Sequence, residues 1–119
     1  MISTKTDSVH EEHTGSSGSL PWYVLNSPEL GKPFHDFYVA CNKDGVLDKK
    51  TKELLKLSLA SVFRCPSCTE SYIKSSLDAG ASKEEITETL LISAMEAAGT
   101  QLYWARETFV KYLGKRSKG

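Results

Sequence analysis

The sequence predicts an all-α protein of about five helices. Apolar residues recur three and four positions apart in several segments, as they do on the buried face of a helix. No stretch alternates apolar and polar residues for long enough to form a strand. Residues that favour helix ends stand between the periodic segments. A chain of 119 residues is long enough for one domain with a small core.

The N-terminal part of the chain divides into a tail and an apolar lead-in. Residues 1–19 carry few apolar side chains and are expected to form a loose tail, because they cannot bury enough surface to offset the entropy of ordering. Its two histidines, His10 and His13, are expected to be solvated. A single domain is expected over residues 20–119, and its apolar start at 20–25 should pack on the domain or on a neighbouring subunit.

Two helices are predicted in the first half of this domain. The first is expected to begin at Pro33 and to carry Cys41 as a core residue, before a turn at 42–45. The second is expected to begin after Asp48, a good N-cap, and to end at Arg64. The apolar face of the first consists of Phe34, Phe37, Tyr38 and Cys41, and that of the second of Leu54, Leu55, Leu59, Val62 and Phe63.

Three further helices are predicted in the second half. Pro66 suits a first helical position, so one helix should run from there to about Ala79 and stop at Gly80, a favoured left-handed cap. The next should begin with a capping box formed by Ser82 and Glu85. Small residues at 94–99 are expected to mark a break before a last helix at 101–113. The apolar residues of these two helices include Ile86, Leu90, Ala94, Ala97, Leu102, Ala105, Phe109, Val110 and Leu113.

Charge and hydropathy exclude several classes of partner. Fifteen basic and fifteen acidic side chains balance, so nothing electrostatic suggests nucleic acid or an acidic membrane surface. No apolar run approaches the length of a membrane span, and no secretory leader is evident at the N-terminus. The protein is therefore expected to be cytoplasmic, without a nucleic-acid or membrane partner. In that compartment a CxxC pair is typical of redox or metal chemistry rather than of a permanent crosslink.

The cysteine pair at 65 and 68 is the group with the clearest chemical potential. Because Pro66 suits the first helical position, Cys65 should be the helix cap and Cys68 the third helical residue. Backbone N–H groups and the positive end of the helix dipole stabilise an anion there, so a thiol should ionise more easily than usual. A second thiol one turn away can close onto the first as a disulfide. Glu53 stands twelve residues before Cys65.

The cysteine pair has two other interpretations. Two cysteines three residues apart form half of a zinc site, but a complete site needs two more ligands. Cys41 and His35 lie on another predicted helix and the other histidines lie in the tail, so no zinc site is expected. The two thiols could also be buried and purely structural, since free cysteine is among the most buried residue types.

The stretch from Leu47 to Thr100 resembles the core of the carboxymuconolactone decarboxylase superfamily, and within it the CxxC-bearing alkylhydroperoxidase D (AhpD) branch. The matching features are Glu53 in a KEL-type helix, the CPSC motif twelve residues later, Gly80, the SKEEI helix start and the AAG segment near Gly99. The resemblance implies an AhpD-like helical fold, homotrimers or hexamers, and peroxidase or thiol–disulfide chemistry without a metal or organic cofactor.

The resemblance also implies roles for the site residues. A peroxide or small disulfide would be the substrate and a thiol the electron donor, with Cys68 attacking and Cys65 resolving; helix geometry alone leaves the order of the two thiols open. Glu53 is the candidate proton acceptor, direct or through water. Tyr72 stands four residues after Cys68, where the family has a relay histidine, and Ser67 stands where the peroxidase often has another.

The tyrosine changes the expected activity. A phenol with a pKa of about 10 is a poor base at neutral pH, although its O–H group can donate a hydrogen bond. Glu70 and Ser71 could substitute, but neither has the basicity of imidazole. The sequence therefore predicts a weak peroxiredoxin-type oxidoreductase, an antioxidant enzyme with catalytic residues Cys65, Cys68, Glu53 and Tyr72. The alternatives are a non-catalytic oligomeric binding or scaffold protein with structural cysteines, and a metal site shared between subunits.

Overall fold

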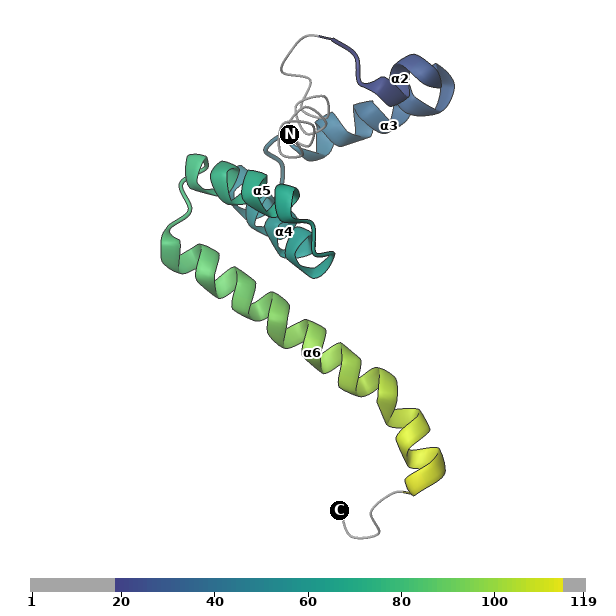
Figure 1. The fold of residues 1–119 in the computed structure, drawn as a ribbon. Coiled ribbons are helices and arrows are strands. Elements are labelled where there is room, and N and C mark those ends of the chain that lie inside the picture. The colour runs from purple at the N-terminus through teal and green to yellow at the C-terminus, as the bar shows by residue number, and fades with distance from the viewer. Residues whose placement is uncertain (1–18, 115–119) are drawn as a thin grey trace.

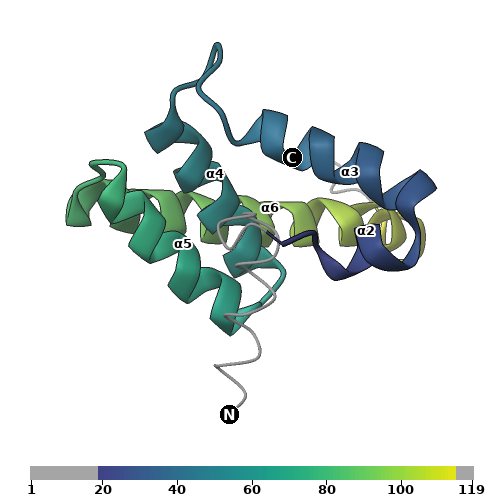
Figure 2. The same cartoon turned by 90° about the horizontal axis from the view of Figure 1, so that it is seen from above.

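The computed structural model describes residues 19–114, which form five helices and no strand (Figure 1). The all-α prediction is confirmed. The helices are α2 (Trp22–Asn26), α3 (Pro28–Cys41), α4 (Lys49–Val62), α5 (Pro66–Asp78) and α6 (Lys83–Leu113). Helices α4 and α5 pack together and against the first half of α6 (Figure 1 and Figure 2), whereas α2 and α3 pack on each other, and Figure 1 shows them apart from α6. The predicted tail lies outside the described residues, apart from Ser19.

The helix predicted to begin at Pro33 begins five residues earlier, and the apolar lead-in before it is also helical. Pro28 occupies the first turn of α3, where a proline fits, and Pro33 lies inside the helix. The short helix α2 turns back onto α3 and buries Val24. A Cβ atom at Gly31 would lie 2.5 Å from the carbonyl oxygen of Tyr23, so the glycine permits this close approach.

The prediction that Cys41 is a core residue is wrong for the protomer. Its thiol is free and exposed at the end of α3, and Phe34 and Phe37 on the same stripe are exposed as well. The reason is that α3 packs on the short α2 rather than on the bundle of α4, α5 and α6. The spacing of the stripe is helical, as predicted. Phe34 contacts Tyr23 of α2 and Tyr38 contacts Tyr72 of α5, but Phe37 and Cys41 stay exposed.

The buried side of α4 differs from the apolar face predicted for it. Leu57 is fully buried and Ala60 nearly so, and both lie on the same side as Glu53. Leu57 forms a core cluster with Ala81 and Ile86. The prediction had the correct helical spacing but chose the wrong side of the helix as buried. Four of the five residues of the predicted face are exposed, namely Leu55, Leu59, Val62 and Phe63.

The predicted caps of the three bundle helices are confirmed. The side chain of Asp48 accepts a hydrogen bond from the Thr51 amide at the start of α4. Ser82 and Glu85 form the reciprocal capping box of α6. Gly80 follows α5 with a φ of 97°, a left-handed conformation that glycine adopts without a steric penalty.

The last two predicted helices are one continuous helix of 31 residues, so the predicted break at 94–99 is wrong. Alanine is the best helix former, and the single glycine, Gly99, costs only about 1 kcal/mol there. No proline interrupts the helix. Only the first half of α6 packs on α4 and α5, and its second half projects beyond them (Figure 1).

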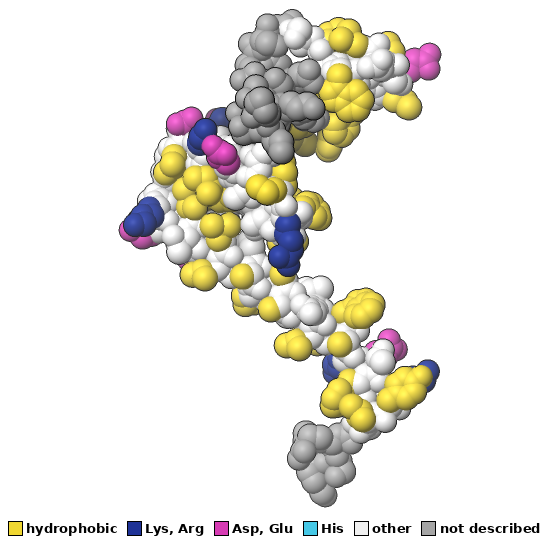
Figure 3. Space-filling view, in the orientation of Figure 1, with side chains coloured by type: hydrophobic (Ala, Val, Ile, Leu, Met, Phe, Trp, Pro, Cys, Tyr) yellow, Lys and Arg dark blue, Asp and Glu magenta, His cyan; other side chains and the backbone are white. Residues whose placement is uncertain are grey.

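Among the described residues, many more large hydrophobic side chains are exposed than hydrophobic residues are buried. Hydrophobic side chains line the whole length of α6 and continue onto α4 and α5 (Figure 3). The Cα radius of gyration is 19.1 Å, whereas a compact domain of this length should have about 13.5 Å. No helix within residues 19–114 combines the length and apolarity needed to cross a membrane.

Candidate redox site

Cys65 and Cys68 lie at the start of α5 and are joined as a disulfide, with their Cα atoms 5.3 Å apart. As predicted, Cys65 is the N-cap and Pro66 the first helical residue. The amide of Cys68 donates a hydrogen bond to the Cys65 sulfur at 3.3 Å, and the Ser67 hydroxyl lies 3.7 Å from that sulfur. The Cα separation falls within the usual range for disulfides, so the backbone holds both sulfurs where they can bond.

The turn before the pair has an unusual backbone conformation. Arg64 adopts a φ of 59°, in the left-handed region that is normally taken by glycine after a helix. The next amide, that of Cys65, donates to the carbonyl of Ala60 at 3.0 Å and so closes the end of α4. This tight turn carries the chain directly from the end of α4 into the cysteine pair.

A pocket of about 260 Å³ opens beside the disulfide. Its walls combine the two cysteines with apolar side chains, one lysine and one tyrosine; the lining residues are Lys56, Leu59, Ala60, Phe63, Cys65, Cys68 and Tyr72. Three of the four predicted site residues therefore meet at one pocket. Glu53, the fourth, does not line it.

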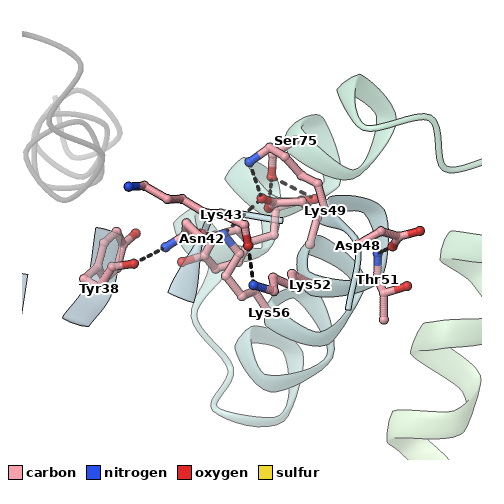
Figure 4. Close-up of polar contacts among 11 residues, drawn as sticks. Tyr38, Asn42, Lys43, Asp48, Lys49, Thr51, Lys52, Lys56 and Ser75 are labelled. Atoms are coloured by element: carbon pink, nitrogen blue, oxygen red, sulfur yellow. Dashed lines mark hydrogen bonds and ion pairs between the residues drawn. The ribbon is translucent and has the colours of Figure 1, made fainter. Parts of the chain in front are cut away.

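Glu53 is buried, with 3% of its surface exposed, and is held by three side chains. These are Lys49, Lys56 and Ser75, which Figure 4 labels. The Ser75 hydroxyl donates to Oε1 at 2.7 Å, while Lys49 and Lys56 lie 3.3 and 3.1 Å from Oε2. Burial alone would raise the pKa of this carboxyl, but the Ser75 hydrogen bond and the two ammonium groups outweigh it and lower the pKa. Glu53 is therefore ionised at neutral pH and is a weak base.

Tyr72 is half-buried between α5 and the end of α3. Its phenol shares a hydrogen bond with Tyr38, and the Lys56 ammonium lies 5.1 Å from the centre of its ring. Burial raises the pKa of Tyr72, and the negative charge of Glu53 raises it further, although the hydrogen bond from Tyr38 works in the other direction. The phenol stays neutral at physiological pH and can donate a hydrogen bond, but it cannot act as the general base.

Several residues of this site were missed from the sequence. The spacing of Ser75 could have predicted its place in the site, because it lies three residues after Tyr72 and so on the same face of α5. The spacing of Lys56, three residues after Glu53, could have predicted its place in the same way. Tyr38 and Asn42 come from α3 and its end, and no local pattern predicts that contact. Of the suggested substitutes for the histidine, neither lines the pocket, and Glu70 instead pairs with Lys74 at 3.3 Å on the surface.

Within 19–114, no three His, Cys, Asp or Glu side chains lie close enough together to hold a metal ion. His10 and His13 lie outside the described part of the chain.

Replacing Glu53 with glutamine is expected to destabilise the fold by about 2–4 kcal/mol at pH 7, because two ammonium groups lose a buried carboxylate. The folded pKa of Glu53 lies below its unfolded value of about 4.3, so its stabilisation is complete above that pH and is lost as pH falls through the folded pKa. Urea unfolding should therefore show a constant difference between wild type and Glu53→Gln above about pH 5 and a shrinking difference in acid.

The matched control is Glu70→Gln, because Glu70 forms an ion pair with Lys74 but is 64% exposed. That variant should lose at most about 0.5 kcal/mol. If Glu53→Gln and Glu70→Gln lower the free energy of unfolding equally, the buried contacts of Glu53 do not contribute more to stability than an exposed ion pair does.

Comparison with known proteins agrees with this architecture. Residues 28–110 match the Carboxymuconolactone decarboxylase family. The chain is also 37% identical over 73 residues to a protein from Paracoccus denitrificans described as "Uncharacterized protein 4 in cox locus". That match covers 58% of this chain and 66% of the relative, just under two thirds of its length. The family match spans helices α3 to α5 and most of α6, so the chain belongs to the carboxymuconolactone decarboxylase family.

Proposed function

We propose that this protein is a thiol–disulfide oxidoreductase of the AhpD-like branch, with a weak peroxidase activity that uses Cys65 and Cys68 as its redox couple. The observation that carries the proposal is the placement of both cysteines, at bonding distance, on the wall of a pocket that also contains Lys56 and Tyr72. Family membership supports it, and a cytoplasmic location would keep the pair accessible to reducing thiols.

The proposed cycle begins with the reduced pair. The Cys68 thiolate attacks one oxygen of a peroxide, the O–O bond breaks, and Cys68 becomes a sulfenic acid while the leaving alkoxide takes a proton. The Cys65 thiol then attacks the Cys68 sulfur, forms the disulfide and releases water. An external thiol donor supplies two electrons and two protons to restore the pair. A small disulfide substrate would enter by thiol exchange instead. No metal or organic cofactor takes part.

The remaining site residues have supporting roles in this proposal. Tyr72 donates a hydrogen bond to the thiolate or to the leaving oxygen from the position that the relay histidine takes in the family. Glu53, as an ionised carboxylate, is the candidate proton acceptor, but its low pKa and its place behind Lys56 make it an ineffective one. General-base help is typically worth about a hundredfold or more, which is why the peroxidase activity should be weak.

A turnover assay tests the proposal. Reduced protein should consume hydrogen peroxide or an organic hydroperoxide in the presence of a dithiol, and each catalytic cycle should pass through the Cys65–Cys68 disulfide. Failure to consume peroxide, combined with failure to exchange with a small disulfide, would reject the redox function.

Self-association is a further part of the proposal. Exposed apolar side chains cover both ends of the protomer, including Trp22 on α2 and Trp104 on α6. Apolar surface of this extent is rare on monomeric proteins. We expect a homo-oligomer, a trimer or hexamer by family likeness, and light scattering at micromolar concentration should give a mass several times 13.2 kDa. A mass of one chain would contradict this expectation.

The exposed length of α6 also favours a second candidate, an oligomeric binding or scaffold protein with structural cysteines. The two candidates differ in the chemistry of the pair. A scaffold should assemble equally well with Cys68→Ser and show no peroxide turnover in the wild type.

A further inference from the structure

Lys56 lines the pocket of the cysteine pair, together with Cys65 and Cys68, and is 26% exposed. Its ammonium group is held by Glu53 on α4, by Asn42 at the C-cap of α3 and by the ring of Tyr72, which lines the same pocket. The ammonium is 3.1 Å from the Glu53 carboxylate and donates to the Asn42 side-chain oxygen. A lysine side chain normally loses much rotamer entropy when it is fixed, and these contacts offset that cost.

The charges around the site leave an excess positive charge at this point. Glu53 carries one negative charge and is shared by Lys49 and Lys56, so the three groups together carry one net positive charge. Lys49 is 55% exposed and does not line the pocket, whereas Lys56 does. The neutral Tyr72 and the apolar walls compensate none of this charge.

We propose that Lys56 supplies the positive charge that stabilises the thiolate formed in this pocket, and that Glu53, Asn42 and Tyr72 are positioning residues for its ammonium group. The proposal rests on the redox function above and deepens it. In a site without an imidazole, a fixed cation favours the thiolate directly, and the thiol proton leaves to water. Glu53 then acts through Lys56 rather than by accepting the proton itself.

The test is the pH dependence of thiol alkylation in reduced, full-length protein carrying Cys41→Ser, which removes the third thiol. Iodoacetamide would be used from pH 5.5 to 10, and mass spectrometry would separate adducts at Cys65 from those at Cys68. Lys56→Met should slow alkylation of the more reactive thiol roughly 3- to 30-fold at pH 7. The two rates should converge above about pH 9.5, where either thiol is ionised without help.

Three variants separate charge from structure. Lys56→Gln keeps hydrogen-bonding groups but not the charge, and it should react with iodoacetamide as slowly as Lys56→Met. Agreement between the two variants would show that the slower reaction does not come from misfolding of Lys56→Met. Lys56→Arg should keep most of the wild-type reactivity. Lys49→Met removes the other cation that pairs with Glu53, outside the pocket, and should stay within about twofold of wild type.

The proposal is overturned if the neutral variants at 56 keep the wild-type pH profile, if Lys56→Arg loses as much reactivity as Lys56→Met, or if Lys49→Met loses as much. Each of these results leaves the redox function intact as long as the wild-type pair is still oxidised by peroxide. Conversely, the redox function would be rejected by a wild-type pair that alkylates normally but forms a disulfide neither with peroxide nor by exchange with a small disulfide, whatever the pH profiles of the Lys56 variants.

Discussion

Cys68→Ser is expected to lower peroxide turnover by roughly a thousandfold or more, because the substitution removes the proposed nucleophile and the disulfide with it. A serine hydroxyl remains protonated at neutral pH and is not activated by a neighbouring base in this site. Little residual peroxide turnover is therefore expected. Cys41→Ser is the matched control. Cys41 is exposed at the end of α3 and does not line the pocket, so its replacement should leave turnover unchanged.

The companion variant Cys65→Ser establishes the order of the two thiols. If Cys68 attacks first, Cys65→Ser should still react once with peroxide and stop at a sulfenic acid on Cys68, which dimedone labels and mass spectrometry detects. The backbone amide of Cys68 donates a hydrogen bond to the Cys65 sulfur. Because this hydrogen bond favours a negative charge on Cys65, the experiment must also detect the opposite order. Labelling of Cys65 in the Cys68→Ser protein, with none in Cys65→Ser, would reverse the proposed order.

Tyr72→His is expected to raise peroxide turnover by roughly ten- to a thousandfold, because it restores a base at the family position, four residues from Cys68 on the same helix face. The Lys56 ammonium lies beside this position and disfavours a second positive charge, so the imidazole should remain neutral and able to accept a proton. Turnover should be compared at pH 7 in a steady-state assay with one fixed thiol donor.

Tyr72→Phe is the control for the hydroxyl alone. It keeps the ring against Lys56 and removes the hydrogen-bond donor, so the pKa of the reactive thiol should rise while the fold survives. If neither Tyr72 variant changes the rate of peroxide turnover, and Cys68→Ser does not change it either, the cysteine pair serves structure or assembly rather than turnover.

The local signals in the sequence were sufficient to predict the part of the fold that carries the site. The cap at Asp48, the proline after Cys65, the left-handed Gly80 and the capping box at Ser82 depend on short-range backbone geometry, and the structure has each of them. The same short-range logic places the two sulfurs within bonding distance. These features needed no knowledge of how the helices pack.

The errors arise where packing decides the outcome. Helical spacing identified a stripe on α3 and a broad face on α4, but it could not show that α3 turns toward α2, which leaves Cys41 exposed, or that α4 is buried around Leu57. The small residues near Gly99 suggested a break, although alanine sustains a helix. The contacts that surround Glu53 and Tyr72 join three helices, so Asn42 and Tyr38 could not be assigned to the site from spacing alone.

The central claim, that Cys65 and Cys68 are a reversible redox couple, is tested most directly by equilibrating the Cys41→Ser protein in glutathione buffers of defined potential. Alkylation and mass spectrometry then count the free thiols at each potential. The account predicts one reversible two-electron transition in which both cysteines change together, with a midpoint between about −300 and −180 mV, where thiol–disulfide catalysts operate. Two thiols that stay free at every potential, or a disulfide that no glutathione buffer reduces, would contradict it.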